Sequence, residues 1–78
     1  MKAEIRILET LLNWKYPMDG GKPGKAFNIA FETKVSISHT YLVLRYLAER
    51  GLVEKSPMGH WYVKNREKAV RWLKDVKS

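Results

Sequence analysis

SISHTYLVLRYLAERGLV, residues 36–53, is the stretch that decides the fold, because it predicts one helix with a clear start and a clear end. Ser36 is a good N-cap, since its hydroxyl can accept a hydrogen bond from a free backbone N–H of the first turn. Gly51 suits the position just after a helix, where the left-handed conformation costs glycine nothing. Leu52 can then contact Leu47, the apolar contact that accompanies this kind of closure. We therefore predict a helix over residues 36–50.

The two faces of this helix differ in chemistry. Thr40, Leu44 and Leu47 fall on one side and predict the buried face. The opposite face carries polar and exposed-type residues, namely Ser38, Tyr41, Leu42 and Arg45. A helix that only covers a core does not need these residues, whereas a helix that lies in a DNA groove does.

The remaining chain supplies the other parts of a compact DNA-binding fold. Helical periodicity predicts helices over 3–14, 26–33 and 66–77, with a Pro- and Gly-rich loop over 15–25. After Gly51 the spacing changes to two, which predicts a hairpin over 52–64, and Asn65 is placed to cap the last helix. The order predicts a single domain, 1–78, of the mostly helical α+β class: a winged helix-turn-helix with a three-helix core, a β-hairpin wing and a C-terminal helix.

Apolar stripes at both ends of the chain suggest a second subunit. The first helix has two stripes, and we expect Ile7, Leu11 and Trp14 to face a partner while the other stripe faces the core. The last helix offers a further stripe of Trp72, Leu73 and Val76. The alternative is that a small domain uses all of these residues internally, since a chain of this size has a thin core.

Charge points to an anionic partner. The net charge of the 78 residues is +7; residues 1–19 are neutral, and the excess lies in 20–50 and 51–78. A basic half on a small domain is typical of nucleic-acid binding.

Cysteine is absent, which excludes disulfides and thiolate metal sites. No apolar run approaches the roughly 20 residues of a membrane span, and no signal-peptide pattern is present, so we expect a cytoplasmic protein. The lack of glutamine beside abundant Lys, Arg and Glu hints at a thermophile.

The segment IAFETKVSISHTYLVLRYLAERGLVEKSP, residues 29–57, resembles the DNA-binding core of MarR-like prokaryotic, including archaeal, transcription regulators. The similarity covers roughly residues 26–64 and rests mainly on structural positions. Two residues depart from the family pattern. Lys34 stands where the turn usually has Gly, which implies either a left-handed Lys34 or a different turn. Thr40 replaces Val or Ile, and we expect its hydroxyl to bond a carbonyl one turn back.

The candidate DNA contacts lie on three elements. They are Ser36, Ser38, His39, Tyr41, Leu42 and Arg45 on the helix; Lys55, Ser56, His60 and Lys64 on the hairpin; and Lys22 and Lys25 before the second helix. His39 has the alternative of filling the first turn, Tyr41 and Leu42 that of a protein interface, and the lysines of the loop that of a solvated connector. Arg45 suits guanine or a phosphate.

Catalysis is not indicated. His39 and His60 belong to different elements, and neither has a carboxylate at metal-ligand spacing, so we expect no catalytic residues, no metal and no cofactor. The sequence therefore predicts a double-stranded DNA-binding transcription regulator that acts as a homodimer, and repression because so small a chain has little surface for recruiting polymerase. No small-molecule effector is indicated. The alternative is a winged helix that binds protein or RNA within a transcription or replication complex.

Overall fold

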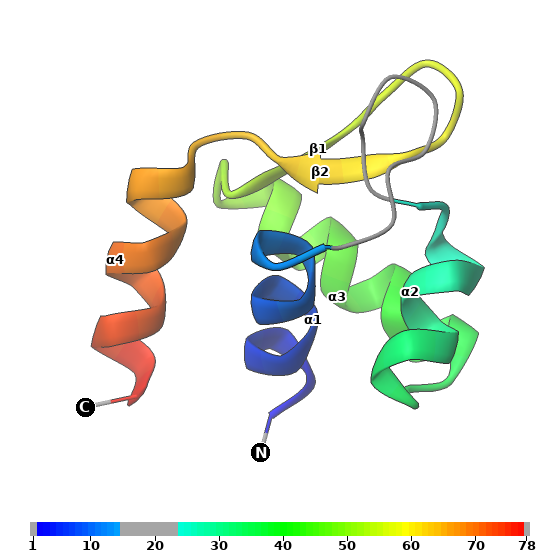
Figure 1. Cartoon of the computed structure of the whole chain (residues 1–78), viewed down its shortest axis with the longest axis horizontal. Coiled ribbons are helices and arrows are strands. Elements are labelled where there is room, and N and C mark those ends of the chain that lie inside the picture. The colour runs from blue at the N-terminus through cyan, green and yellow to red at the C-terminus, as the bar shows by residue number, and fades with distance from the viewer. Residues whose placement is uncertain (1, 15–23, 78) are drawn as a thin grey trace.

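The computed structural model describes residues 2–14 and 24–77, and the predicted fold class is confirmed. The chain forms four helices, α1 (Ala3–Leu12), α2 (Ala26–Thr33), α3 (Ile37–Glu49) and α4 (Arg66–Lys77), and a hairpin of β1 (Val53–Lys55) and β2 (Trp61–Val63) between α3 and α4 in the sequence. Helix α1 ends two residues before the predicted end, and most of the predicted loop 15–25 lies outside the described residues. Figure 1 shows α4 on one side of α1 and α2 on the other.

Helix α1 is the hub of the molecule, because it contacts α2, α3, α4 and β2. Its neighbours cover both apolar stripes. Ile7 and Leu8 are fully buried and Leu11 nearly so, within one core that includes Leu44 and Leu47 of α3. The prediction that Ile7 and Leu11 face a second subunit is therefore wrong, since their own chain covers them.

The C-terminal stripe is also used in part within the chain. Leu73 is buried together with Ala69, Trp72 is half-buried, and only Val76 of the predicted stripe is exposed. Leu73 is thus excluded as a dimer contact because it packs into the core. Trp14 is half-buried against the same core.

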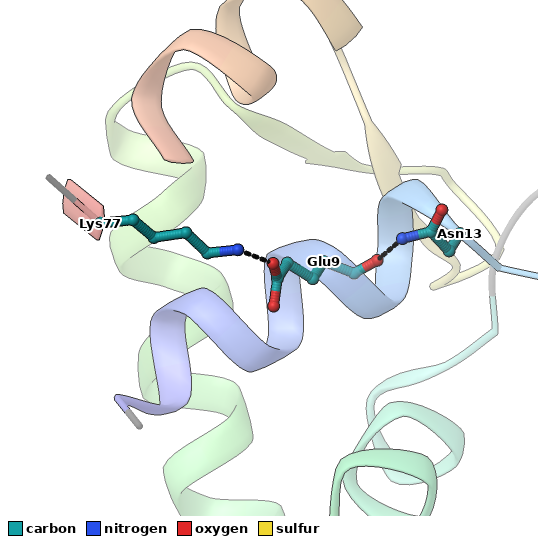
Figure 2. Close-up of polar contacts among 3 residues, drawn as sticks. All are labelled: Glu9, Asn13 and Lys77. Carbon is teal, nitrogen blue, oxygen red and sulfur yellow. Dashed lines mark hydrogen bonds and ion pairs between the residues drawn. The ribbon is translucent and has the colours of Figure 1, made fainter. Parts of the chain in front are cut away.

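Two polar contacts join the two ends of α4 to α1. The Arg66 guanidinium donates to the carbonyl oxygen of Leu12 over 3.1 Å. At the far end the Lys77 ammonium pairs with the Glu9 carboxylate, as Figure 2 shows. Asn65 caps α4 as predicted, its side chain accepting a hydrogen bond from the backbone N–H of Lys68. These contacts fix α4 along one side of α1.

The hairpin is antiparallel, with Val53 opposite Val63 and Lys55 opposite Trp61. Val53 and Trp61 are buried, which joins the base of the hairpin to the helical core. The Trp61 N–H also donates to the carbonyl of Gly24, just before α2, over 3.2 Å. The segment that leads into α2 is therefore held against the hairpin.

Candidate nucleic-acid interface

Helix α3 begins and ends as its sequence predicts. The Ser36 hydroxyl accepts the backbone N–H of His39 at 3.2 Å. At the other end Gly51 has φ +74°, its N–H donates to Ala48, and the Leu52 N–H donates to the carbonyl of Leu47 over 3.0 Å. This pair of bonds is the Schellman closure. The helix is thus fixed at both ends by local chemistry.

The turn between α2 and α3 is built on a left-handed lysine. Lys34 has φ 58° and ψ 36°, so the first of the two alternatives for this turn is correct. The Val35 N–H reaches back to the carbonyl of Ala30 over 3.2 Å and closes α2. The Arg6 guanidinium of α1 donates to the carbonyl of Thr33, the last residue of α2, over 3.0 Å. The turn that sets the angle between α2 and α3 is therefore held to α1.

Burial divides α3 as the sequence predicts. Thr40, Val43, Leu44 and Leu47 are buried. The expected bond of the Thr40 hydroxyl is absent, however: among the described residues this oxygen has no hydrogen-bond partner. The prediction of a bond to a carbonyl one turn back is wrong, and the fully buried hydroxyl is left unsatisfied.

The predicted contact residues of α3 lie on its solvent side. Ser36, Ser38, His39, Tyr41, Leu42 and Arg45 are all exposed. Ser38, Leu42 and Arg45 fall on one line of the helix, because they are spaced by four and three residues. His39 and Leu42 also line a shallow hollow of about 220 Å³ beside Glu4 of α1. Ser38, Leu42 and Arg45 thus form one exposed line along α3.

The hairpin presents only part of its predicted set. Lys55 and Lys64 are exposed, Lys55 with its ammonium 5.8 Å from the ring centre of Trp61 and Lys64 with its ammonium 3.6 Å from a carboxylate oxygen of Glu54. Ser56 and His60 are buried. Their selection as DNA contacts is wrong, because the Ser56 hydroxyl accepts the His60 N–H over 3.1 Å and is used to build the turn.

The carboxylate of Glu54 on the hairpin raises the pKa of Tyr62. The Tyr62 hydroxyl donates to the Glu54 carboxylate across the two strands. This hydrogen bond is the main reason that the pKa of Tyr62 is raised above 10.0. Glu54 therefore neutralises part of the positive charge of the hairpin and holds Tyr62 in its protonated form.

Of the two loop lysines, Lys25 is exposed directly before α2 and Lys22 lies outside the described residues. Gly24 precedes Lys25 and leaves no room for a side chain, since a Cβ there would lie 2.8 Å from the side-chain oxygen of Asn28. That same oxygen accepts the Lys25 N–H at 3.0 Å. The backbone of Lys25 at the start of α2 is therefore held in a defined place.

Several exposed residues were missed by the sequence predictions. Glu49 continues the line of Ser38, Leu42 and Arg45, and helical spacing was sufficient to find it. Ile37 in the first turn of α3 is 47% exposed. On α2, Phe27 is 57% and Phe31 82% exposed, and their spacing of four predicted a shared face but not its exposure.

Other kinds of site find little support in the part of the chain that the structure describes. It contains no group of three or more His, Asp or Glu side chains suited to a metal ion. No helix within residues 2–14 and 24–77 is both long and apolar enough to cross a membrane.

Helices α1, α2 and α3 pack together, α2 and α3 form a helix-turn-helix, and the hairpin follows α3. This arrangement defines a winged-helix fold. A solved structure with this fold is that of S. agalactiae BusR in complex with its busA-promotor DNA, which superposes with a TM-score of 0.74 at 20% sequence identity. The match covers 97% of this chain and 39% of the BusR chain, so the chain spans well under half of that protein. No protein-family model matches the sequence, and no curated protein does.

Proposed function

We propose that this chain is a sequence-specific, double-stranded DNA-binding transcription regulator. The observation that carries the proposal is the solvent face of α3, where Ser38, Leu42 and Arg45 form one line on a helix fixed at both ends. Such a helix can enter the major groove, and its side chains can reach base edges. Exposed Lys25, Lys55 and Lys64 offer further cations for phosphates.

Charge and the structural likeness support the same function. The net charge of +7 attracts a polyanion, and phosphate contacts supply most sequence-independent affinity. BusR, which has the same fold, was solved in complex with promoter DNA. The resemblance of this chain to MarR-like regulators is a further part of the proposal. So is a cytoplasmic location, which agrees with a promoter as the target.

We further propose that the regulator acts as a homodimer. Two copies of α3 would enter successive major grooves about 34 Å apart on a roughly palindromic site. Because Ile7, Leu11 and Leu73 are buried, α4 is the better surface for pairing: Val70 and Val76 are exposed and Trp72 is half-buried. Sedimentation at tens of micromolar tests this, and a monomer there would contradict the dimer.

Repression is the mode of action we propose, because occupying a promoter requires DNA binding and nothing more. A reporter gene whose promoter carries the selected binding site would lose expression when the protein is present. A rise in expression would instead make the protein an activator.

The DNA-binding proposal is tested by fluorescence anisotropy with labelled duplexes from a randomised pool. Arg45→Ala should weaken binding about tenfold or more, as expected for loss of a charged hydrogen bond worth roughly 1.5–3 kcal/mol. If Arg45 meets a phosphate, the slope of log affinity against log salt should also fall by about one. Arg71→Ala, which removes an exposed cation from α4, is the matched control on a duplex with a single half-site, where pairing through α4 does not contribute, and it should change affinity little there.

Failure has a clear form. If the wild-type protein binds no duplex even at low salt, the function is wrong. If binding is normal in Arg45→Ala and weak in Arg71→Ala, the contact surface lies on α4 instead of α3.

One observation favours a second candidate, a winged helix that binds another protein or RNA. Phe27 and Phe31 expose two aromatic rings on one face of α2, and such patches mark interaction surfaces. Phe31→Lys should leave duplex binding nearly intact if DNA is the main partner. A protein that prefers RNA to duplex DNA in competition would support the second candidate.

A further inference from the structure

The first turns of α3 expose large apolar side chains. Ile37 is 47%, Tyr41 50% and Leu42 62% exposed, within six residues of one another. All three occupy the end of the helix that reaches base edges in helix-turn-helix complexes. Isolated exposed apolar residues are ordinary, but a cluster at a contact surface indicates what that surface binds.

Helix α3 is also poor in the residues that read adenine. The segment Ile37–Glu49 contains no Asn, Gln or Lys. Asn and Gln are the side chains that pair with the major-groove edge of adenine through two hydrogen bonds. Its exposed polar groups in the first turns are the hydroxyls of Ser38 and Tyr41 and the imidazole of His39, with Arg45 further along. Direct readout by hydrogen bonds is therefore sparse.

Base edges differ in whether they suit apolar side chains. In the major groove only thymine presents an apolar group, its C5-methyl, whereas a G·C pair presents donors and acceptors alone. Apolar side chains placed against G·C would leave those polar groups without partners, which is costly. An A·T pair also carries polar groups, but the same side chains gain there by burying the thymine methyl group, which a G·C pair lacks.

We propose that α3 recognises an A·T-rich duplex chiefly through thymine C5-methyl groups, contacted by Ile37, Tyr41 and Leu42. This inference rests on the proposed DNA-binding function and names its preferred sequence class. DNA is the occupant of this apolar surface because it carries the charge opposite to the exposed cations Arg45 and Lys25 and to the net charge of +7. The methyl contacts provide the preference, and the phosphate contacts provide the common affinity.

The test uses labelled duplexes of equal length and charge with alternating A-T, A-U, G-C or G-5-methyl-C sequence. Alternation places a methyl group, or its absence, in every register, so the optimal site need not be known. Exchanging thymine for uracil removes only the methyl, and affinity should fall about fourfold for each methyl buried, from about 0.8 kcal/mol per CH₂ group. Methylating cytosine should recover part of the affinity lost in G-C.

Variants assign the effect to α3. In Leu42→Ala the ratio of A-T to A-U affinity should move toward one, and the side chain is exposed enough that folding is not at risk. Phe31→Ala removes an exposed apolar side chain from α2 and should keep the wild-type ratio. Circular dichroism of both variants checks that each is folded.

The outcomes separate the inference from the function on which it rests. Binding to all four duplexes with equal A-T and A-U affinity would overturn the methyl readout while leaving DNA binding intact, and would assign Ile37, Tyr41 and Leu42 to a protein partner. An unchanged ratio in Leu42→Ala would overturn the assignment to α3. Absence of binding to every duplex at low salt would overturn both the function and the inference.

Discussion

Thr40→Val should make the protein more stable. Thr40 is fully buried in α3, and its hydroxyl has no hydrogen-bond partner among the described residues. A buried polar group without a partner costs roughly 1–3 kcal/mol, because it lost its bonds to water and gained none in return. Valine has nearly the same shape, so the exchange removes the hydroxyl without opening a cavity.

The magnitude follows from these terms. Thr and Val are both β-branched and differ little in helix propensity, so the helix itself is nearly indifferent to the exchange. Relief of the unsatisfied hydroxyl should therefore raise the free energy of unfolding by about 1–2 kcal/mol. For a domain of this size the melting temperature should rise by about 4–8 °C for each kcal/mol.

Thermal unfolding followed by circular dichroism measures the effect, and urea unfolding with an unchanged slope confirms that stability alone has changed. Thr33→Val is the matched control. Thr33 is also buried, but its hydroxyl donates to the carbonyl of Ile29 over 2.7 Å, so the same exchange there should destabilise. An unchanged or lower melting temperature for Thr40→Val would refute the reasoning and show that the Thr40 hydroxyl is bonded after all.

Three further expectations follow from local features. Lys34→Gly should stabilise the protein by up to about 1 kcal/mol in urea unfolding, because Lys34 has φ 58° and glycine adopts this conformation without strain; no gain would show that the lysine is unstrained. Ile7→Ala should destabilise by roughly 2–5 kcal/mol, measured in the same way, because Ile7 is fully buried; a change in subunit association alone would return it to an interface. The pKa of Tyr62 is raised by its hydrogen bond to Glu54, so the stability it contributes is present below pH 10.0 and is lost as pH rises through the raised value. Ultraviolet absorbance titration of wild type against Tyr62→Phe should show the Tyr62 transition above those of ordinary tyrosines, and a transition at the ordinary value would mean that the bond does not form in solution.

The features of the fold that could be predicted are those set by neighbours in the sequence. The cap at Ser36 and the closure at Gly51 depend on residues within a single turn, and both are present. The change from helical spacing to alternation after Gly51 likewise predicted the hairpin, whose strands pair Val53 with Val63. Local hydrogen bonding and periodicity need no knowledge of distant contacts.

The errors arose where several elements meet. Two stripes on α1 suggested one surface for the core and one for a partner, but α1 is contacted by four elements, which bury Ile7 and Leu11 together. The width of an apolar stripe shows how much of a helix is covered and not by what. Only the packing of all four elements distinguishes an internal stripe from an intermolecular one.

In the candidate site too, the residues set by local spacing were predicted and those that depend on the folded turn were not. The exposed residues of α3 were predicted because one helix face can be read from its spacing alone. Ser56 and His60 were chosen for their chemistry, yet the turn of the hairpin uses the Ser56 hydroxyl for its own backbone. A polar side chain near a tight turn is often consumed by the turn. The basic contribution of the hairpin is thereby reduced to Lys55 and Lys64.

The position of α4 constrains any dimer that reads two half-sites. The Arg66 and Lys77 contacts tie both ends of α4 to the C-terminal half of α1, and Arg6 ties α1 to the last residue of α2, beside the turn that leads into α3. A partner docking on α4 would therefore be connected to α3 through a chain of fixed contacts. Removing the Glu9 carboxylate would loosen that connection without changing the exposed face of α3. Glu9→Gln should then weaken binding to a double half-site more than to a single one; equal effects on both would show that the α4 tether does not set the spacing.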